Sequence, residues 1–172
     1  MEVYWIPGPW RGRLAILPRP RGGDWLADDV RSWRQSGFDI VVSLLTPEEA
    51  NELALAQEEQ HCKANGIQYV AFPVADRGVP SSPAATLDLV SRLDKALAEG
   101  KNIGIHCRQG IGRSPLIAAY LLVLSGMDLE SAFQQVSSAR GYSVPETTEQ
   151  REWVTKHAHT TNLAKVPRSS EG

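Results

Sequence analysis

The residues with the clearest chemical potential lie in one stretch, HCRQGIGRS, which begins at His106 and ends at Ser114. One of only two cysteines in the chain, Cys107, stands between a short apolar run and a turn that contains two glycines. An arginine, Arg113, follows the turn and precedes a long apolar segment. A thiol, flexible turn residues and a permanent cation so close together predict nucleophilic chemistry on a bound anion.

The turn itself is suited to binding a phosphate group. A strand that ends at His106 and a helix that begins near Ser114 leave room only for a tight loop. Gly110 and Gly112 allow several backbone N–H groups of this loop to face one concavity. The N-terminus of the following helix adds a partial positive charge, and Arg113 offers a planar fork of donors. The loop therefore predicts a site for a dianion.

Cys107 lies at the base of this loop. Amide dipoles, a helix terminus and a guanidinium favour a thiolate, and such surroundings lower cysteine pKa values to roughly 3.5–7.5. A thiolate below a bound phosphoryl group is placed for in-line attack on phosphorus. The plainer alternative is that His106 and Cys107 end a buried strand and the glycines merely turn the chain. The joint occurrence of cysteine, glycines, arginine and hydroxyl favours the chemical interpretation.

Three segments resemble one known family. The pattern C-x5-R-S after a strand, from Cys107 to Ser114, is similar to the signature loop of the cysteine-dependent protein tyrosine and dual-specificity phosphatases. FPVADRGVP, from Phe72 to Pro80, resembles their general-acid loop, most closely that of the kinase-associated phosphatase branch. VPETTEQREWV resembles their later glutamine loop. The matching segments span most of residues 5–155, although only the signature loop is specific by itself.

The resemblance implies a two-step reaction with a role for each residue of the loop. Cys107 attacks phosphorus to form a cysteinyl phosphate, and Ser114 hydrogen-bonds the sulfur and eases its departure in the second step. A plain helix N-cap is the simpler interpretation of Ser114, and it is compatible with that role. Negative charge on the equatorial oxygens is stabilised by a guanidinium and by backbone amides. These phosphate-binding groups belong to Arg108, Gln109, Gly110, Ile111, Gly112 and Arg113.

The leaving oxygen of a phosphorylated side chain needs a proton, so a carboxylic acid should reach the loop from elsewhere. Asp76 is the best candidate because it lies on a loop after a predicted strand, between Pro73 and Pro80. A turn aspartate that only caps its own backbone is the alternative. Once deprotonated, the same aspartate could activate water for hydrolysis of the intermediate.

Two further residues are expected to support the reaction. His106 is expected to order the loop through hydrogen bonds of its ring, with a satisfied buried histidine as the alternative. Gln150 matches the family glutamine that places the attacking water; the alternatives are a surface helix position, or Gln134 or Gln135 in its place. Cys62 is expected to be a structural thiol. A redox bridge between the two cysteines is left open, with nothing in the sequence that places them within bonding distance.

Strand-like and helix-like segments alternate along the chain. This order predicts one α/β domain with a central, mostly parallel (mixed) sheet of about four or five strands flanked by helices, like that of the protein tyrosine phosphatases it resembles. The predicted strands are 14–17, 38–45, 67–72 and 101–106. The predicted helices are 24–35, one that starts with a capping box at Thr46 and stops by Asn65, then 83–99, 114–125, 128–140 and 146–157.

Size and composition set the remaining expectations. With 172 residues and 42% apolar content, the chain suits one catalytic domain over 1–159, followed by a polar, disordered tail over 160–172. A net charge of −2 gives no global reason to bind nucleic acid or a membrane surface, and no secretory signal or membrane-spanning run is recognisable. We therefore expect a cytoplasmic monomer that uses no metal or other cofactor.

The expected function is removal of phosphate from phosphotyrosine, phosphoserine or phosphothreonine in a protein or peptide. A phosphoinositide or another small phosphate is the first alternative substrate, disfavoured because the loop carries Arg108 as its one extra cation and no lysine. A non-catalytic phosphoprotein-binding module would usually have lost the cysteine, the arginine or the acid. A rhodanese-like sulfurtransferase usually has a loop one residue shorter and no use for an acid such as Asp76.

Overall fold

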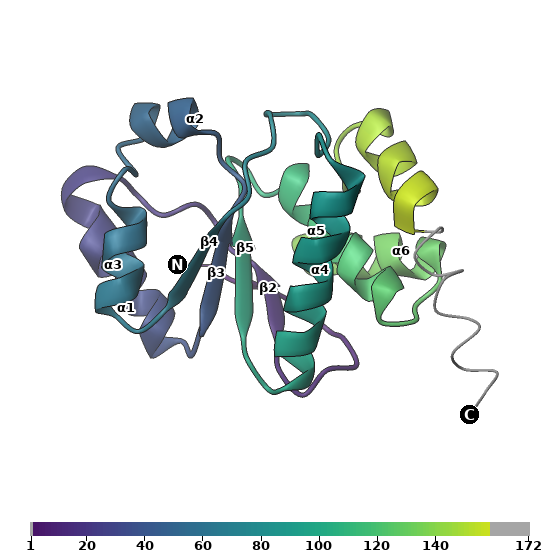
Figure 1. Cartoon of the computed structure of the whole chain (residues 1–172), viewed down its shortest axis with the longest axis horizontal. Helices are drawn as coiled ribbons and strands as arrows, with labels where there is room; N and C mark the ends of the chain where they lie inside the picture. The colour runs from purple at the N-terminus through teal and green to yellow at the C-terminus, as the bar shows by residue number, and fades with distance from the viewer. Residues whose placement is uncertain (1, 159–172) are drawn as a thin grey trace.

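The centre of the fold is a five-stranded sheet with the order β1-β2-β5-β3-β4 (Figure 1). The computed structural model describes residues 2–158. Strand β1 is antiparallel to β2, and the other neighbouring strands are parallel. The predicted mixed, mostly parallel sheet is thereby confirmed. The strands are β1 (Tyr4–Ile6), β2 (Leu14–Ile16), β3 (Ile40–Ser43), β4 (Gln68–Ala71) and β5 (Ile103–His106).

Helices cover both faces of this sheet. On one face lie α1 (Leu26–Gln35), preceded by a 3-10 turn, η1 (Gly23–Trp25), and α3 (Glu58–Ala64). On the other face lie α4 (Pro83–Ala98), α5 (Arg113–Leu124), α6 (Leu129–Arg140) and a last helix over 148–158 (Figure 1). Successive strand residues serve opposite faces, so Val42 packs on the side of α5 while Val41 packs with Trp33 of α1.

One predicted helix is divided in the structure. The segment expected to run from Thr46 to Asn65 forms two short helices, α2 (Pro47–Glu52) and α3, with a turn between them. Ala54 in this turn has a φ of 56°, and its carbonyl accepts a hydrogen bond of 3.1 Å from the Gly23 N–H. The break therefore allows Leu55 to enter the core and the chain before α1 to pack against the turn. A prediction from helical start and stop residues alone missed this tertiary contact.

Strand β1 is the other element that the sequence did not predict. It has three residues, of which only Ile6 is buried, so it carries no periodic pattern. The predicted core helix behind the cysteine is confirmed, because every residue of α5 is buried. None of the helices within residues 2–158 is long and apolar enough to cross a membrane. The predicted tail, 160–172, lies outside the described residues.

Candidate active site

The phosphate loop, Cys107–Gly112, connects β5 to α5 at the carboxyl ends of the parallel strands, the edge at which open α/β sheets bind ligands. Cys107 is only 3% exposed, and its Sγ accepts a hydrogen bond of 3.3 Å from the Gly110 N–H. Gly110 has a φ of 74°, a left-handed conformation that other residues rarely adopt. The turn at this glycine therefore points a backbone N–H group at the sulfur.

Several carbonyl groups of the phosphate loop accept hydrogen bonds from residues that lie outside the loop. Arg140 of α6 donates to the carbonyls of Gly110 at 3.1 Å and of Gln109 at 3.2 Å. The Glu146 N–H donates to the Ile111 carbonyl at 2.8 Å. Because these contacts hold the carbonyls away from the centre of the loop, the N–H edge is left for an anion. Arg140 had no role in the sequence-based prediction, since nothing local to α6 indicates contact with the loop.

Arg113 is the first residue of α5, and its guanidinium is buried. Nη1 and Nη2 donate to both carboxylate oxygens of Glu49, at 2.7 and 2.9 Å. Nη1 also donates to the Val74 carbonyl at 2.8 Å, and Nη2 donates to Asp76 Oδ1 at 3.1 Å. The planar cation is therefore fixed in one orientation by groups from α2 and from the loop after β4.

Glu49 is a site residue that the sequence-based prediction missed. The sequence assigns it only to the capping box of α2, where its Oε1 accepts the Thr46 N–H at 3.0 Å. The same carboxylate holds Arg113. Burial alone would raise the pKa of Glu49, but hydrogen bonds from Arg113 and Thr46 lower it to about 2. Its one sequence signal is its place on α2, the first helix after β3, near the edge of the sheet where the phosphate loop and the loop after β4 lie.

The acid loop, residues 72–82, follows β4 and carries Asp76 to the guanidinium of Arg113. A turn over Ala75–Gly78 is closed by the Gly78 N–H, which donates to the Ala75 carbonyl at 2.8 Å. The Asp76 side chain is 54% exposed, so its carboxyl group is open to solvent and to a ligand. The structure thus brings together the cysteine, the arginine and the aspartate that were predicted from three separate patterns.

Gln150, on the helix over 148–158, is fully buried between the two loops. Its Nε2 donates to the Gly78 carbonyl of the acid loop at 3.1 Å. A Cβ built on Gly112 of the phosphate loop would lie 2.9 Å from the same nitrogen, which shows how closely the two residues approach. The surface position considered as an alternative for Gln150 is therefore wrong. Gln135 on α6 is half-buried and donates to the Pro7 carbonyl instead.

His106 is bonded away from the phosphate loop. Its Nε2 lies 2.6 Å from Glu58 Oε2 of α3, and both side chains are buried. Its Nδ1 has no hydrogen-bond partner within the described part of the chain. The ring is thus held by α3, in agreement with the alternative of a buried, partnered histidine. A buried carboxylate such as Glu58 requires a hydrogen-bonding partner, and the His106 ring supplies one.

The hydroxyl of Ser114 is buried, and its Oγ has no partner among the residues that the structure describes. The N-cap of α5 is Gly112, so the alternative role of Ser114 as N-cap is wrong. Both cysteines are free thiols. Burial, together with the charges of Glu58 and Glu59, raises the pKa of Cys62 to about 12, which makes it an inert packed thiol. Within residues 2–158 there is no cluster of side chains suited to a metal ion.

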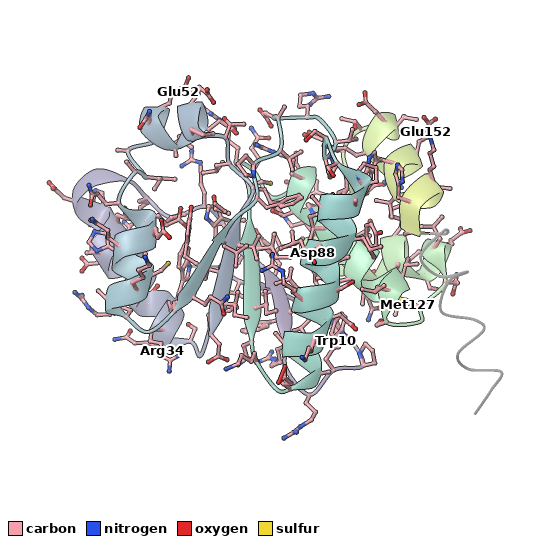
Figure 2. All side chains as sticks on the ribbon, in the orientation of Figure 1. Trp10, Arg34, Glu52, Asp88, Met127 and Glu152 are labelled. Atoms are coloured by element: carbon pink, nitrogen blue, oxygen red, sulfur yellow. The ribbon has the colours of Figure 1, made fainter. Side chains whose placement is uncertain are left out.

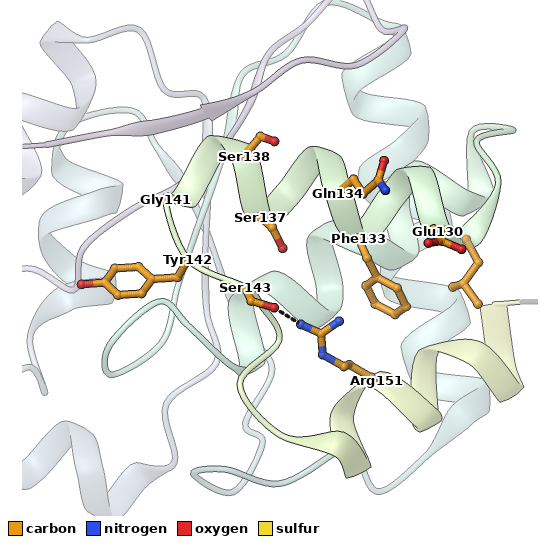
Figure 3. A pocket seen from close by; sticks show the side chains of 10 residues that line it. Glu130, Phe133, Gln134, Ser137, Ser138, Gly141, Tyr142, Ser143 and Arg151 are labelled. Carbon is orange, nitrogen blue, oxygen red and sulfur yellow. Dashed lines mark hydrogen bonds between the residues drawn. The ribbon is translucent and has the colours of Figure 1, made fainter.

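One groove of the described structure is separate from the phosphate loop. It is a groove of about 670 Å³ between α6 and the last helix, with Phe133, Gln134 and Tyr142 among its lining residues (Figure 3). Arg151 is one of the lining residues and donates to Ser143 Oγ at 2.7 Å. No residue of the phosphate loop or the acid loop lines this groove. Gln134 therefore lies apart from the site, unlike Gln150.

Comparison with known sequences identifies the family. The family model described as dual specificity phosphatase, catalytic domain, matches residues 31–159. The mouse protein tyrosine phosphatase domain-containing protein 1 is 39% identical over 75% of this chain and 19% of its own length. The putative tyrosine phosphatase 197R of invertebrate iridescent virus 6 is 27% identical over 78% of this chain and 50% of its own length. The chain thus spans half or less of these curated relatives.

Solved structures share the fold. A crystal structure of kinase-associated phosphatase, with its catalytic-site cysteine replaced by serine, has a TM-score of 0.86 at 20% identity and covers 94% of this chain and 96% of its own. PTPMT1 in complex with PI(5)P has a TM-score of 0.74 at 17% identity, with 93% and 98% covered. At these identities the likeness concerns the fold alone.

Proposed function

The chain belongs to the dual specificity phosphatase family, and we propose that it removes phosphate from tyrosine, serine and threonine side chains of proteins through a cysteinyl-phosphate intermediate. One observation carries the proposal. The Arg113 guanidinium, fixed by Glu49, also contacts Asp76 at the head of the helix that follows Cys107. In the proposed reaction Cys107 is the nucleophile, Arg113 is the phosphate-binding cation and Asp76 is the proton donor.

In the first step the Cys107 thiolate attacks phosphorus opposite the leaving oxygen. An S–P bond forms, the P–O bond to the substrate breaks, and the leaving oxygen takes the proton of the Asp76 carboxylic acid. Charge on the equatorial oxygens is stabilised by the loop amides and by the Arg113 guanidinium. Because these donors are fixed before substrate binds, little reorganisation is needed in the transition state.

In the second step water attacks the cysteinyl phosphate. The Asp76 carboxylate accepts a proton from the water as the new P–O bond forms and the S–P bond breaks. The Ser114 hydroxyl, which is buried and without another partner among the described residues, donates to the departing sulfur. Gln150 closes the side of the site between the phosphate loop and the acid loop, where it orients the water. Inorganic phosphate is released and the thiolate is restored.

Charge around the loop favours a protein phosphate over a polyphosphorylated headgroup. Arg108 is the only basic residue of the phosphate loop besides Arg113, which begins α5. Its Nη1 already lies 3.5 Å from Glu52 Oε2 and 3.8 Å from Glu49 Oε2. The extra cation is thus balanced by acids of α2, where Glu52 lies on the outer side of the molecule (Figure 2). A headgroup with several phosphates would meet this acidic helix and be repelled.

The test compares wild-type protein with two variants on 4-nitrophenyl phosphate, phosphopeptides and phosphoinositide vesicles. Cys107→Ser should lower turnover by roughly 10³-fold or more while it still binds phosphopeptide, because only the nucleophile is removed. Asp76→Asn should lower phosphopeptide turnover by roughly 10²-fold or more. Equal rates for wild type and Cys107→Ser would refute the catalytic proposal. Turnover of the vesicles in preference to every phosphopeptide would replace the proposed substrate class.

Two broader properties belong to the same proposal. We propose that the working form is a monomer and that it acts in the cytoplasm; the low net charge gives no reason for it to bind a membrane surface. Light scattering coupled to gel filtration tests the first property, and imaging of the tagged protein in cells tests the second. A stable dimer or a membrane-bound signal would contradict them.

A further inference from the structure

An ion pair joins the acid loop to the chain after α6. Arg77 Nη1 lies 3.1 Å from Glu146 Oε2, and the two residues are 69 positions apart in the sequence. The Arg77 side chain is 66% exposed, whereas that of Glu146 is only 20% exposed. The arginine therefore reaches from the surface turn to a glutamate that is already part of the packed structure.

Glu146 is fixed by its contacts with the phosphate loop. Its N–H donates to the Ile111 carbonyl at 2.8 Å. A Cβ on Gly112 would lie 3.0 Å from Glu146 Oε1, so its side chain lies directly against the loop. The segment 146–150 consequently touches the phosphate loop on one side and the acid loop on the other.

The backbone at Arg77 is one that normally favours glycine. Arg77 has a φ of 61° and is the third residue of the turn over Ala75–Gly78. A positive φ at the third residue with a negative φ at the second is the pattern of a type II turn, in which glycine or asparagine is usual at this place. An arginine here opposes the local backbone preference, so its presence is explained by what the side chain does.

Asp76 needs a support other than Arg113. Its carboxylate accepts a hydrogen bond of 3.1 Å from Nη2 of that arginine. A bound phosphate takes donors of the same guanidinium, because planar bidentate recognition of phosphate is what arginine provides. Asp76 must then be held over the leaving oxygen by its own loop, and the residue directly after it is anchored to Glu146.

We propose that the Arg77–Glu146 ion pair is the positioning contact for the general acid, and that it holds Asp76 over the phosphate loop while substrate is bound. Arg77 and Glu146 act through Asp76 and touch no reacting atom. The inference rests on the proposed function, since it assigns a support to the proton donor of that reaction.

A positioning role of this kind predicts an effect that depends on the leaving group. Phenolate is a poor leaving group and needs the proton from Asp76, whereas 4-nitrophenolate leaves readily without it. In Arg77→Gly, kcat on phenyl phosphate should fall roughly three- to tenfold. A partly exposed ion pair shifts the balance between the positioned and the displaced acid loop by a few fold, and an acid that is out of place transfers its proton less efficiently. On 4-nitrophenyl phosphate kcat should change less than about twofold, since the thiolate and Arg113 are untouched.

Arg77→Gly also separates positioning from stability. Glycine adopts a positive φ without strain, so the variant should have the melting temperature of the wild type or a higher one, even though its turnover of phenyl phosphate falls. Glu146→Gln should give the same leaving-group effect, and the double variant should be no worse than either single one, because both remove one contact. Arg77→Lys should recover part of the loss. Arg92→Ala, which removes an exposed ion pair with Asp88 on α4, is the matched control and should behave as wild type on both substrates (Figure 2).

Several outcomes would overturn the inference. These are wild-type turnover of phenyl phosphate by Arg77→Gly, an equal loss on both substrates, or a loss that accompanies a lower melting temperature. In each of these cases a wild-type protein that hydrolyses 4-nitrophenyl phosphate in a Cys107-dependent way leaves the proposed function intact. A wild type that hydrolyses neither substrate removes the proposed function and this inference with it.

Discussion

Replacing Glu49 with glutamine tests the electrostatic support of the site. The carboxylate bonds both terminal nitrogens of Arg113, at 2.7 and 2.9 Å, and it also caps α2 through Thr46. Glutamine keeps the size of the side chain and one oxygen for the cap, so Glu49→Gln chiefly removes the negative charge. A buried guanidinium then loses its counterion while it keeps contacts with the Val74 carbonyl and Asp76.

The magnitude follows from the pKa of Glu49, which falls from its usual 4.5 to about 2. At about 1.4 kcal/mol per pH unit, this lowering corresponds to about 3 kcal/mol of folding free energy when the group is ionised. The folded-state pKa lies below the unfolded one, so this contribution is complete above about pH 4.5 and is lost as the pH falls toward 2. Breaking a buried pair while other partners remain gives a similar expectation of about 2–3 kcal/mol at pH 7.

The assay is urea unfolding of wild type and Glu49→Gln at pH 7 and at several values down to pH 2.5. The gap in unfolding free energy should be about 2–3 kcal/mol at pH 7 and should narrow steadily below pH 4.5. Glu52→Gln on the same helix is the control, and its exposed side chain should keep it within about 0.5 kcal/mol of wild type. A gap that is absent at pH 7, or equally wide at pH 2.5, would show that Glu49 is not a charged anchor for Arg113.

Three further changes address contacts around the two loops. Arg140→Met removes two bonds to carbonyls of the phosphate loop and should raise KM for 4-nitrophenyl phosphate roughly tenfold with little effect on the melting temperature; an unchanged KM would contradict a role in shaping the loop. Gly112→Ala places a Cβ 2.9 Å from Gln150 Nε2 and should lower kcat at least about tenfold. Wild-type steady-state kinetics for this variant would show that Gln150 can move aside without loss of activity. Glu58→Gln removes the carboxylate that lies 2.6 Å from His106 in the core and should cost about 3 kcal/mol in urea unfolding; a loss below about 1 kcal/mol would show that His106 does not depend on this carboxylate.

Local patterns in the sequence predict most of the fold because each depends on neighbours in the chain. Apolar runs located the parallel strands, and the capping box at Thr46 correctly placed the start of α2. The end of that helix depends on the chain before α1, which bonds to Ala54 from a distant part of the sequence. Strand β1 likewise exists only because β2 offers an edge to pair with. Such contacts leave no periodic trace in the sequence.

In the candidate site too, residues with a local sequence pattern are predicted and residues placed by tertiary contacts are missed. Cys107 and Arg113 are predicted by one short loop because a strand, a turn and a helix N-terminus impose their relation. Asp76 is predicted by its own turn, since a carboxylic acid is needed and loops at the carboxyl edge of a parallel sheet converge. Glu49 and Arg140 lie on helices whose patterns already have a structural explanation. When a local role such as a helix cap already explains a residue type, the sequence gives no sign of a second role.

The N–H donors of Arg113 are bonded by several separate segments of the chain, and these contacts together orient its guanidinium. Nη1 is occupied by Glu49 and the Val74 carbonyl, and both contacts hold the plane of the guanidinium. Nη2 bonds Glu49 on one side and Asp76 on the other. Of these acceptors only Asp76 is exposed. In the reaction that we propose, an incoming phosphate therefore displaces Asp76 and leaves the other contacts in place. In this proposal Arg113 is oriented before substrate binds. Asp76 becomes free to protonate the leaving oxygen only once the substrate has arrived.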